Sequence, residues 1–109
     1  MTNYQAGDLV LVDFPLTASG PGKVRPAMVI LDTGDADLLL ARVTTQSHAS
    51  GFDVEIHDWQ QAGLLAPSSV RLHKLATIAK SRIRRRLGAV SSADRKQIAA
   101  ALKRIVLSW

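Results

Sequence analysis

An arginine that precedes a proline is the feature of this sequence with the clearest chemical potential. Arg25 lies in the stretch KVRPAMVI, between a loop rich in Gly and Pro and an apolar run. Because the proline ring clashes with the residue before it, we expect Arg25 to be held extended at the mouth of a strand. Such a cation is partly pre-organised to bind an anion, although a plain surface arginine before an edge strand would give the same pattern.

The hairpin that follows predicts what lies beside this arginine. Two runs read as strands with the turn signal DTGD between them, at residues 27–31 and 37–45. If the turn is centred near Gly34, opposed residues have numbers that sum to about 68–70, as in a short-looped hairpin. Arg25 would then lie opposite residues 43–45, with its guanidinium beside the hydroxyls of Thr44 and Thr45.

The composition favours a small domain with an acidic partner. The chain has 109 residues, 47% of them hydrophobic, which fits a single domain over residues 1–109 with one modest core. There are 14 Lys and Arg against 9 Asp and Glu, so nucleic acid is the first expected partner and an acidic protein segment the second. Aromatic residues are only 5%, which argues against a wide base-stacking platform.

Several classes of site lack the residues they require. The chain has no cysteine, which excludes disulfides, thiolate catalysis and cysteine-based zinc sites. Its histidines are not closely spaced (His48, His57 and His73), and phosphate-loop, dinucleotide-binding and HExxH motifs do not occur. We therefore expect no metal and no cofactor. No signal-peptide-like run or membrane-length segment occurs, so we expect a cytoplasmic protein that does not bind membranes.

The remaining pattern predicts short strands followed by a helix. Residues 7–14 (GDLVLVDF) are apolar on both faces and should form a central strand. Residues 15–22 (PLTASGPG) read as a mobile loop. Further strands are expected at 52–56, 69–72, 75–83 and 85–90, with one turn over 57–63 closed by Gly63. Strands of this length suit a small, strongly bent antiparallel sheet or barrel.

A capping-box-like start at SSAD (91–94) indicates the terminal helix. Its apolar residues recur along one narrow stripe, at Ile98, Leu102, Ile105 and Trp109. We expect this stripe to pack on the sheet.

Phosphate chemistry on RNA needs no metal, because RNA carries its own nucleophile, the 2′-hydroxyl. An arginine stabilises charge on the phosphorus, and a threonine hydroxyl adds a hydrogen bond beside it. Arginine is a poor base, whereas an imidazole titrates near neutral pH, so His73 is the candidate for proton transfer. A rim histidine without a role explains His73 equally well.

The densest basic run would place four cations on one face of a strand, namely Lys80, Arg82, Arg84 and Arg86. A stripe that binds the RNA backbone and a solvated strand face are equally good explanations.

Read together, GDLVLVDFPLTASGPGKVRPAMVIL, RVTTQ and LLAPSSVRLHKLATIAKSRIRRRLGAV resemble the MazF/PemK family of toxins from bacterial type II toxin–antitoxin systems. The resemblance implies a mainly β (α+β) fold, a small SH3-like antiparallel β-barrel with a C-terminal helix, shared by CcdB and MazF toxins. It also implies a homodimer and an mRNA interferase, which cleaves single-stranded RNA sequence-specifically without metal and leaves a cyclic phosphate and a free 5′-hydroxyl. A cognate antitoxin would neutralise the toxin by laying an acidic, initially disordered C-terminal segment over the RNA site.

The resemblance also implies roles for individual residues. The catalytic arginine of the family falls on Arg25 and its catalytic threonine on Thr44. Arg71 matches an arginine used for RNA contact or catalysis in some members. His73 stands where some members have an acid, so the proton-transfer group stays open. Further RNA contacts are expected from Lys23, Arg42, Thr45, Gln46, Arg82 and Arg84.

Two other functions fit the same architecture. One is a non-enzymatic inhibitor of the gyrase-poison type, as in CcdB. The other is an inactive RNA-binding homologue, which would bind RNA with a steep salt dependence and leave it uncut.

Overall fold

The computed structural model describes residues 3–14 and 23–109, so the loop expected at 15–22 lies outside the described residues. Along this part of the chain the elements are β1 (Asp8–Asp13), β2 (Val24–Leu31), β3 (Asp37–Thr44), β4 (Asp53–Ile56), β5 (Ser68–Ala79), the short 3-10 helix η1 (Lys80–Arg82), β6 (Ile83–Ala89) and α1 (Ser92–Leu107).

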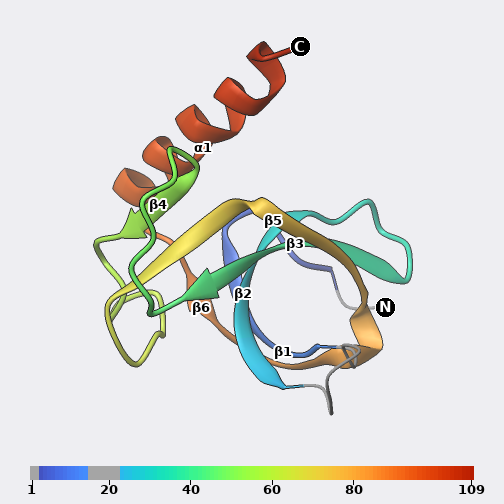
Figure 1. The fold of residues 1–109 in the computed structure, drawn as a ribbon. Helices are drawn as coiled ribbons and strands as arrows, with labels where there is room; N and C mark the ends of the chain where they lie inside the picture. The colour runs from blue at the N-terminus through green and yellow to red at the C-terminus, as the bar shows by residue number, and fades with distance from the viewer. Residues whose placement is uncertain (1–2, 15–22) are drawn as a thin grey trace.

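The strands form one antiparallel sheet that bends back on itself (Figure 1). The strand order is β4–β5–β3–β2–β1–β6. Because β5 runs through η1 directly into β6, and β6 pairs with β1, the sheet curls into a small, incompletely closed barrel. The expected fold, an SH3-like antiparallel barrel with a C-terminal helix, is confirmed. No helix in the described part of the chain is long and apolar enough to cross a membrane.

Alternating apolar residues build a separate core on each side of the strands. The inner core fills the barrel and comprises Val10, Val12, Ala27, Val29, Leu38, Leu40 and Ile78. The outer core lies under α1 and includes Leu9, Met28, Ala41, Val43, Val70, Leu72 and Ile98. Strand β1 contributes to both cores and pairs on both edges, as its two apolar faces predicted. Successive residues of a strand point to opposite faces, so each strand can serve two cores.

The terminal helix begins as predicted and packs over only part of its length. Ser91 is the N-cap and accepts a hydrogen bond from the backbone N–H of Asp94 at 3.2 Å. Ile98 is buried, and Leu102 and Ile105 pack partly against the outer core. Trp109 follows the helix and is fully exposed, so its place in the buried stripe was wrong. Figure 1 shows why, because the second half of α1 projects beyond the sheet.

The segment after residue 68 differs from the prediction. The strands expected at 69–72 and 75–83 form one long strand, β5, which ends in η1. Lys80 therefore does not share a strand face with Arg84 and Arg86. Its side chain is 10% exposed, and its Nζ lies 2.9 Å from Oδ1 of Asp32. The continuous basic stripe expected here is wrong for this physical reason.

Asp32 anchors the β2–β3 turn through several donors. Its carboxylate accepts hydrogen bonds from the backbone N–H groups of Tyr4 and Gly34, each at 2.8 Å, and pairs with Lys80. The Tyr4 N–H, the Lys80 ammonium and the Gly34 N–H, in that order, lower the pKa of Asp32 from 3.8 to about 2. Folding therefore favours the ionised carboxylate.

This shift predicts an acid-dependent loss of stability. A group whose pKa is lower in the folded state stabilises the protein above its unfolded pKa and loses that contribution as the pH falls through the folded pKa. We expect the free energy of unfolding to fall between pH 3.8 and about 2, measured by urea unfolding. The slope should be smaller in Asp32→Asn; Asp37→Asn, which removes an exposed carboxylate of β3, is the control for the loss of one charge. An unchanged slope in Asp32→Asn would contradict the assignment.

The predicted turn closed by Gly63 is present and fits tightly against β6. Gly63 has a φ of +90°, and a Cβ there would lie 2.2 Å from the carbonyl oxygen of Leu87. Gly34 has a similar φ of +91° but has open space around it. A comparison of alanine substitutions at these two glycines therefore distinguishes the cost of backbone strain from the cost of steric overlap.

We expect Gly34→Ala to cost about 1–2 kcal/mol of unfolding free energy, from the left-handed backbone alone. Gly63→Ala should cost clearly more, because the backbone of β6 must also move. Chemical denaturation of the two variants checks this difference. Equal losses would show that the contact between the turn and β6 adjusts freely.

Candidate active site

The β2–β3 hairpin has the register that its turn predicted. Ala27 pairs with Arg42, Met28 with Ala41 and Val29 with Leu40. The same register, continued by two residues, sets Arg25 opposite Thr44. Opposed residues of an antiparallel pair lie on the same face, with Cβ atoms about 4.5–5.5 Å apart. The observed pairs end at Ala27 and Arg42, so the opposition of Arg25 and Thr44 is an extension of this register by two residues.

One pocket of about 190 Å³ gathers these residues. It is lined by Arg25, Pro26, Arg42, Val43, Thr44, Thr45, Gln46 and Ser68. The two arginines are exposed and Thr44 is half-buried. The hydroxyl oxygen of Thr44 accepts a hydrogen bond from the backbone N–H of Gln46 at 3.1 Å, which leaves the hydroxyl proton free to be donated. Two cations and a hydroxyl donor around a small pocket suit a phosphate group.

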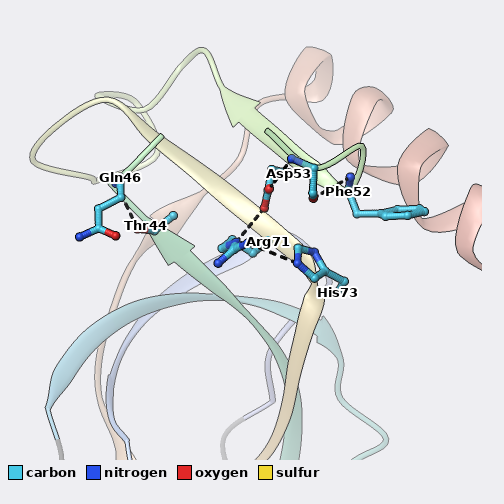
Figure 2. A network of polar contacts seen from close by, with 7 residues as sticks. Thr44, Gln46, Phe52, Asp53, Arg71 and His73 are labelled. Carbon is cyan, nitrogen blue, oxygen red and sulfur yellow. Dashed lines mark hydrogen bonds and ion pairs between the residues drawn. The ribbon is translucent and has the colours of Figure 1, made fainter. Parts of the chain in front are cut away.

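A second polar group continues this face onto β5 and β4 (Figure 2). Arg71 pairs with Arg42 of β3 on one side and with Asp53 of β4 on the other. Its Nε donates to Oδ1 of Asp53 at 2.9 Å, and its Nη2 lies 3.3 Å from Nε2 of His73. Because a guanidinium only donates, this last contact requires a His73 ring whose Nε2 carries no proton.

Asp53 is the most buried polar side chain of this group, with 3% of the side chain exposed. Burial raises the pKa of its carboxyl, but hydrogen bonds from Arg71 and Ser50 and the charge of Arg71 outweigh that effect, so the pKa lies below its ordinary value. Asp53 is therefore held as a carboxylate.

The other predicted contact residues are divided between two places. Lys23 is exposed just before β2, and Thr45 and Gln46 line the pocket. Arg82 and Arg84 lie on η1 and β6, away from the pocket lining, and Arg84 Nη2 is 3.4 Å from Oδ2 of Asp13. Among residues 3–14 and 23–109, no group of three His, Cys, Asp or Glu side chains could hold a metal ion.

The comparisons with known proteins identify the family and the fold of this chain. A family model described as the PemK-like, MazF-like toxin of type II toxin–antitoxin systems matches residues 5–106. The chain belongs to this family. A search of curated protein sequences found no significant match.

Solved structures resemble this MazF/PemK-like chain in fold. An endoribonuclease from Mycobacterial species has a TM-score of 0.73 at 20% identity and covers 94% of this chain and 89% of its own. An endoribonuclease in complex with its cognate antitoxin, also from Mycobacterial species, has a TM-score of 0.73 at 20% identity, with coverages of 92% and 91%. MazF from Deinococcus radiodurans has a TM-score of 0.72 at 21% identity, with coverages of 94% and 96%.

Asp53 is the residue of this toxin's candidate site that the sequence analysis missed. The sequence predicted a strand at residues 52–56 (FDVEI) and gave its acidic residues no role. Only the pairing of β4 with β5 shows that Asp53 lies opposite Arg71. A short acidic strand in a strongly basic chain is the signal that points to such an internal partner.

Proposed function

We propose that this MazF/PemK-like toxin is an endoribonuclease of the mRNA interferase type, which cleaves single-stranded RNA at specific sequences without a metal ion. The observation that supports it most is the pocket lined by both Arg25 and Thr44, which come from different strands. An arginine and a hydroxyl that line one small pocket can bind the two non-bridging oxygens of one phosphodiester.

In the proposed reaction the 2′-oxygen of the RNA attacks the adjacent phosphorus. The bond from phosphorus to the 5′-oxygen breaks, so the products are a 2′,3′-cyclic phosphate and a free 5′-hydroxyl. Negative charge builds on the non-bridging oxygens in between. Arg25 stabilises that charge, and the Thr44 hydroxyl donates a hydrogen bond to it.

Two protons must move in this reaction. One leaves the 2′-hydroxyl and one reaches the departing 5′-oxygen. We assign the first transfer to His73, whose Nε2 carries no proton while it accepts from Arg71. In the reaction the Arg71 N–H donates to a phosphate oxygen instead, and this frees the Nε2 lone pair to take the 2′-proton. The 5′-oxygen departs from the opposite side of the phosphorus, so it takes its proton from water, and the imidazolium returns its own proton to solvent.

The surface around the pocket extends the contact with RNA. Arg42 lies in the pocket, Arg71 lies beside it on β5, and Lys23 stands exposed at its entrance. These cations bind flanking phosphates, while Thr45 and Gln46 can donate to and accept from base edges. A single strand lying across β2, β3 and β5 would contact all of them.

The partners follow from the same charges. A net charge of +5 attracts an acidic segment as well as RNA, and a similar solved structure is an endoribonuclease in complex with its cognate antitoxin. We propose that a cognate antitoxin covers the RNA site of this toxin with an acidic C-terminal segment. The toxin is expected to act in the cytoplasm as a homodimer.

Substitution of the pocket residues tests the proposed reaction. Arg25→Ala and Thr44→Ala should each lower the rate of cleavage of a long single-stranded RNA in EDTA by about 100-fold or more. The matched controls Lys96→Ala and Thr77→Ala change exposed residues of α1 and β5 and should cleave like the wild type. Retained cleavage in both pocket variants would contradict the mechanism. Intact RNA with inhibited gyrase would indicate a gyrase poison, and bound but uncut RNA an inactive homologue.

The salt dependence of RNA binding distinguishes the arginine of the pocket, Arg42, from the arginine of β6, Arg84. With a 2′-O-methyl RNA, which binds but lacks the nucleophile, Arg42→Ala should reduce the slope of log affinity against log salt by about 0.7, the value for one phosphate contact on a single strand. Arg84→Ala should reduce it less, because Arg84 already pairs with Asp13. Equal reductions would place β6 in the RNA interface.

A further inference from the structure

The orientation of Arg71 depends on a residue that does not line the pocket. Across β3 and β5, Arg42 and Arg71 occupy directly opposed positions. Like charges placed directly opposite each other on neighbouring strands repel. This repulsion alone would turn the Arg71 side chain away from Arg42 into solvent. In the structure, however, only 19% of the Arg71 side chain is exposed.

Asp53 supplies the opposing attraction. It pairs with Arg71 from the other neighbouring strand, β4, and its Oδ1 accepts from Arg71 Nε at 2.9 Å. A charge-assisted hydrogen bond of this length between two mostly buried groups is stronger and better defined than an exposed ion pair. Since this bond engages Nε, the terminal nitrogens remain for other partners, and Nη2 lies 3.3 Å from Nε2 of His73 (Figure 2).

The position of Asp53 is itself fixed by the loop before β4. Its Oδ2 accepts from the backbone N–H of Ser50 at 3.2 Å, and its own N–H donates to the Ser50 carbonyl, also at 3.2 Å. Arg104 of α1 donates to the carbonyl of Gly51 and lies over the ring of Phe52, 5.7 Å from its centroid. Both oxygens of the carboxylate are thus engaged, and Arg104 of α1 holds the loop from which β4 begins.

We propose that Asp53 is a positioning residue, which holds Arg71 and, through it, His73 in the arrangement needed to bind and cleave RNA. The inference rests on the proposed function, because Arg71 and His73 are its RNA-contacting and proton-transferring groups. Asp53 itself touches neither RNA nor the reacting atoms. It offsets the repulsion from Arg42 and leaves the terminal nitrogens of Arg71 available for a phosphate.

Asparagine cannot replace this carboxylate. Asp53 accepts from two donors, Arg71 Nε and the Ser50 N–H, whereas an asparagine side chain offers one oxygen and one amide group that only donates. Asp53→Asn must therefore lose one of the two contacts as well as the charge. Because a small misplacement of a positioned group is costly, we expect single-turnover cleavage to slow about 10- to 100-fold.

A double-mutant cycle is the decisive test. If Asp53 acts through Arg71, Asp53→Asn should have almost no further effect once Arg71 is alanine. We expect a change in cleavage of no more than about twofold in that background, which is within the usual scatter of such cycles. The affinity for a 2′-O-methyl RNA should show the same pattern. The matched control is Asp8→Asn, which removes a carboxylate of β1 that pairs with Arg86 of β6 at 3.0 Å. This variant should cleave RNA like the wild type.

Each outcome has a distinct meaning. A full additional loss in the Arg71→Ala background, or an equal loss in Asp8→Asn, overturns the positioning role. If the wild-type toxin binds RNA without cleaving it, the proposed reaction fails, and the cycle measured on affinity still decides the role of Asp53. Should Asp53→Asn not fold, Asp53→Glu keeps both acceptor oxygens but shifts them by one methylene, and the same cycle applies to it.

Discussion

The register of the β2–β3 hairpin is fixed by burial on the inner face of both strands. Ala27 and Val29 of β2 meet Leu38 and Leu40 of β3 in the barrel core. A slip of β3 by one residue would turn Leu38 and Leu40 out of the barrel core. With about 1.5–3 kcal/mol for each large apolar side chain, the observed register is strongly favoured. The same register sets Arg25 opposite Thr44, so apolar packing holds together two polar groups that gain little from each other.

The ion pairs of the basic run after β5 differ from the surroundings of the pocket arginines. On the far side of the sheet, Arg84 and Arg86 pair with Asp13 and Asp8 across β6 and β1, and Lys80 pairs with Asp32. These acids locally neutralise much of the basic run that follows β5. On the site face, Arg25 and Arg42 line the pocket, and Asp53 pairs with Arg71. The positive charge of Arg25 and Arg42 lies where β2 begins and β3 ends, and it attracts a polyanion to the pocket.

Local patterns predicted well those parts of the structure that depend on neighbours in sequence. The turn near Gly34, the two-faced strand β1 and the Ser91 cap each need only a short stretch of chain, and all three were predicted. The errors concern tertiary partners. Lys80 looked like a surface cation because its partner Asp32 lies far back in the sequence. Asp53 had no predicted role because its partner Arg71 follows only from the pairing of β4 with β5. That pairing cannot be derived from a turn, since a long segment separates the two strands. Non-local registers of this kind require the assembled sheet.

A β-bulge in β5 allows this one strand to contribute to both the barrel core and the candidate site. Between Ala41 and Arg42 of β3 the register shifts, so that Leu75 pairs with Ala41 and Arg71 with Arg42, and residues 72–74 have no partner on β3. Leu72 is fully buried in the outer core, and its N–H donates to the carbonyl of Phe52 at 2.9 Å, which anchors the bulge. An odd number of inserted residues reverses the face to which the following side chains point. Leu75–Ala79 can therefore close the barrel while Arg71 joins Arg42 and Asp53 on the other half of the strand. Bulges commonly redirect side chains beside functional sites, and here the bulge allows one strand both to complete the core and to present the guanidinium that Asp53 holds.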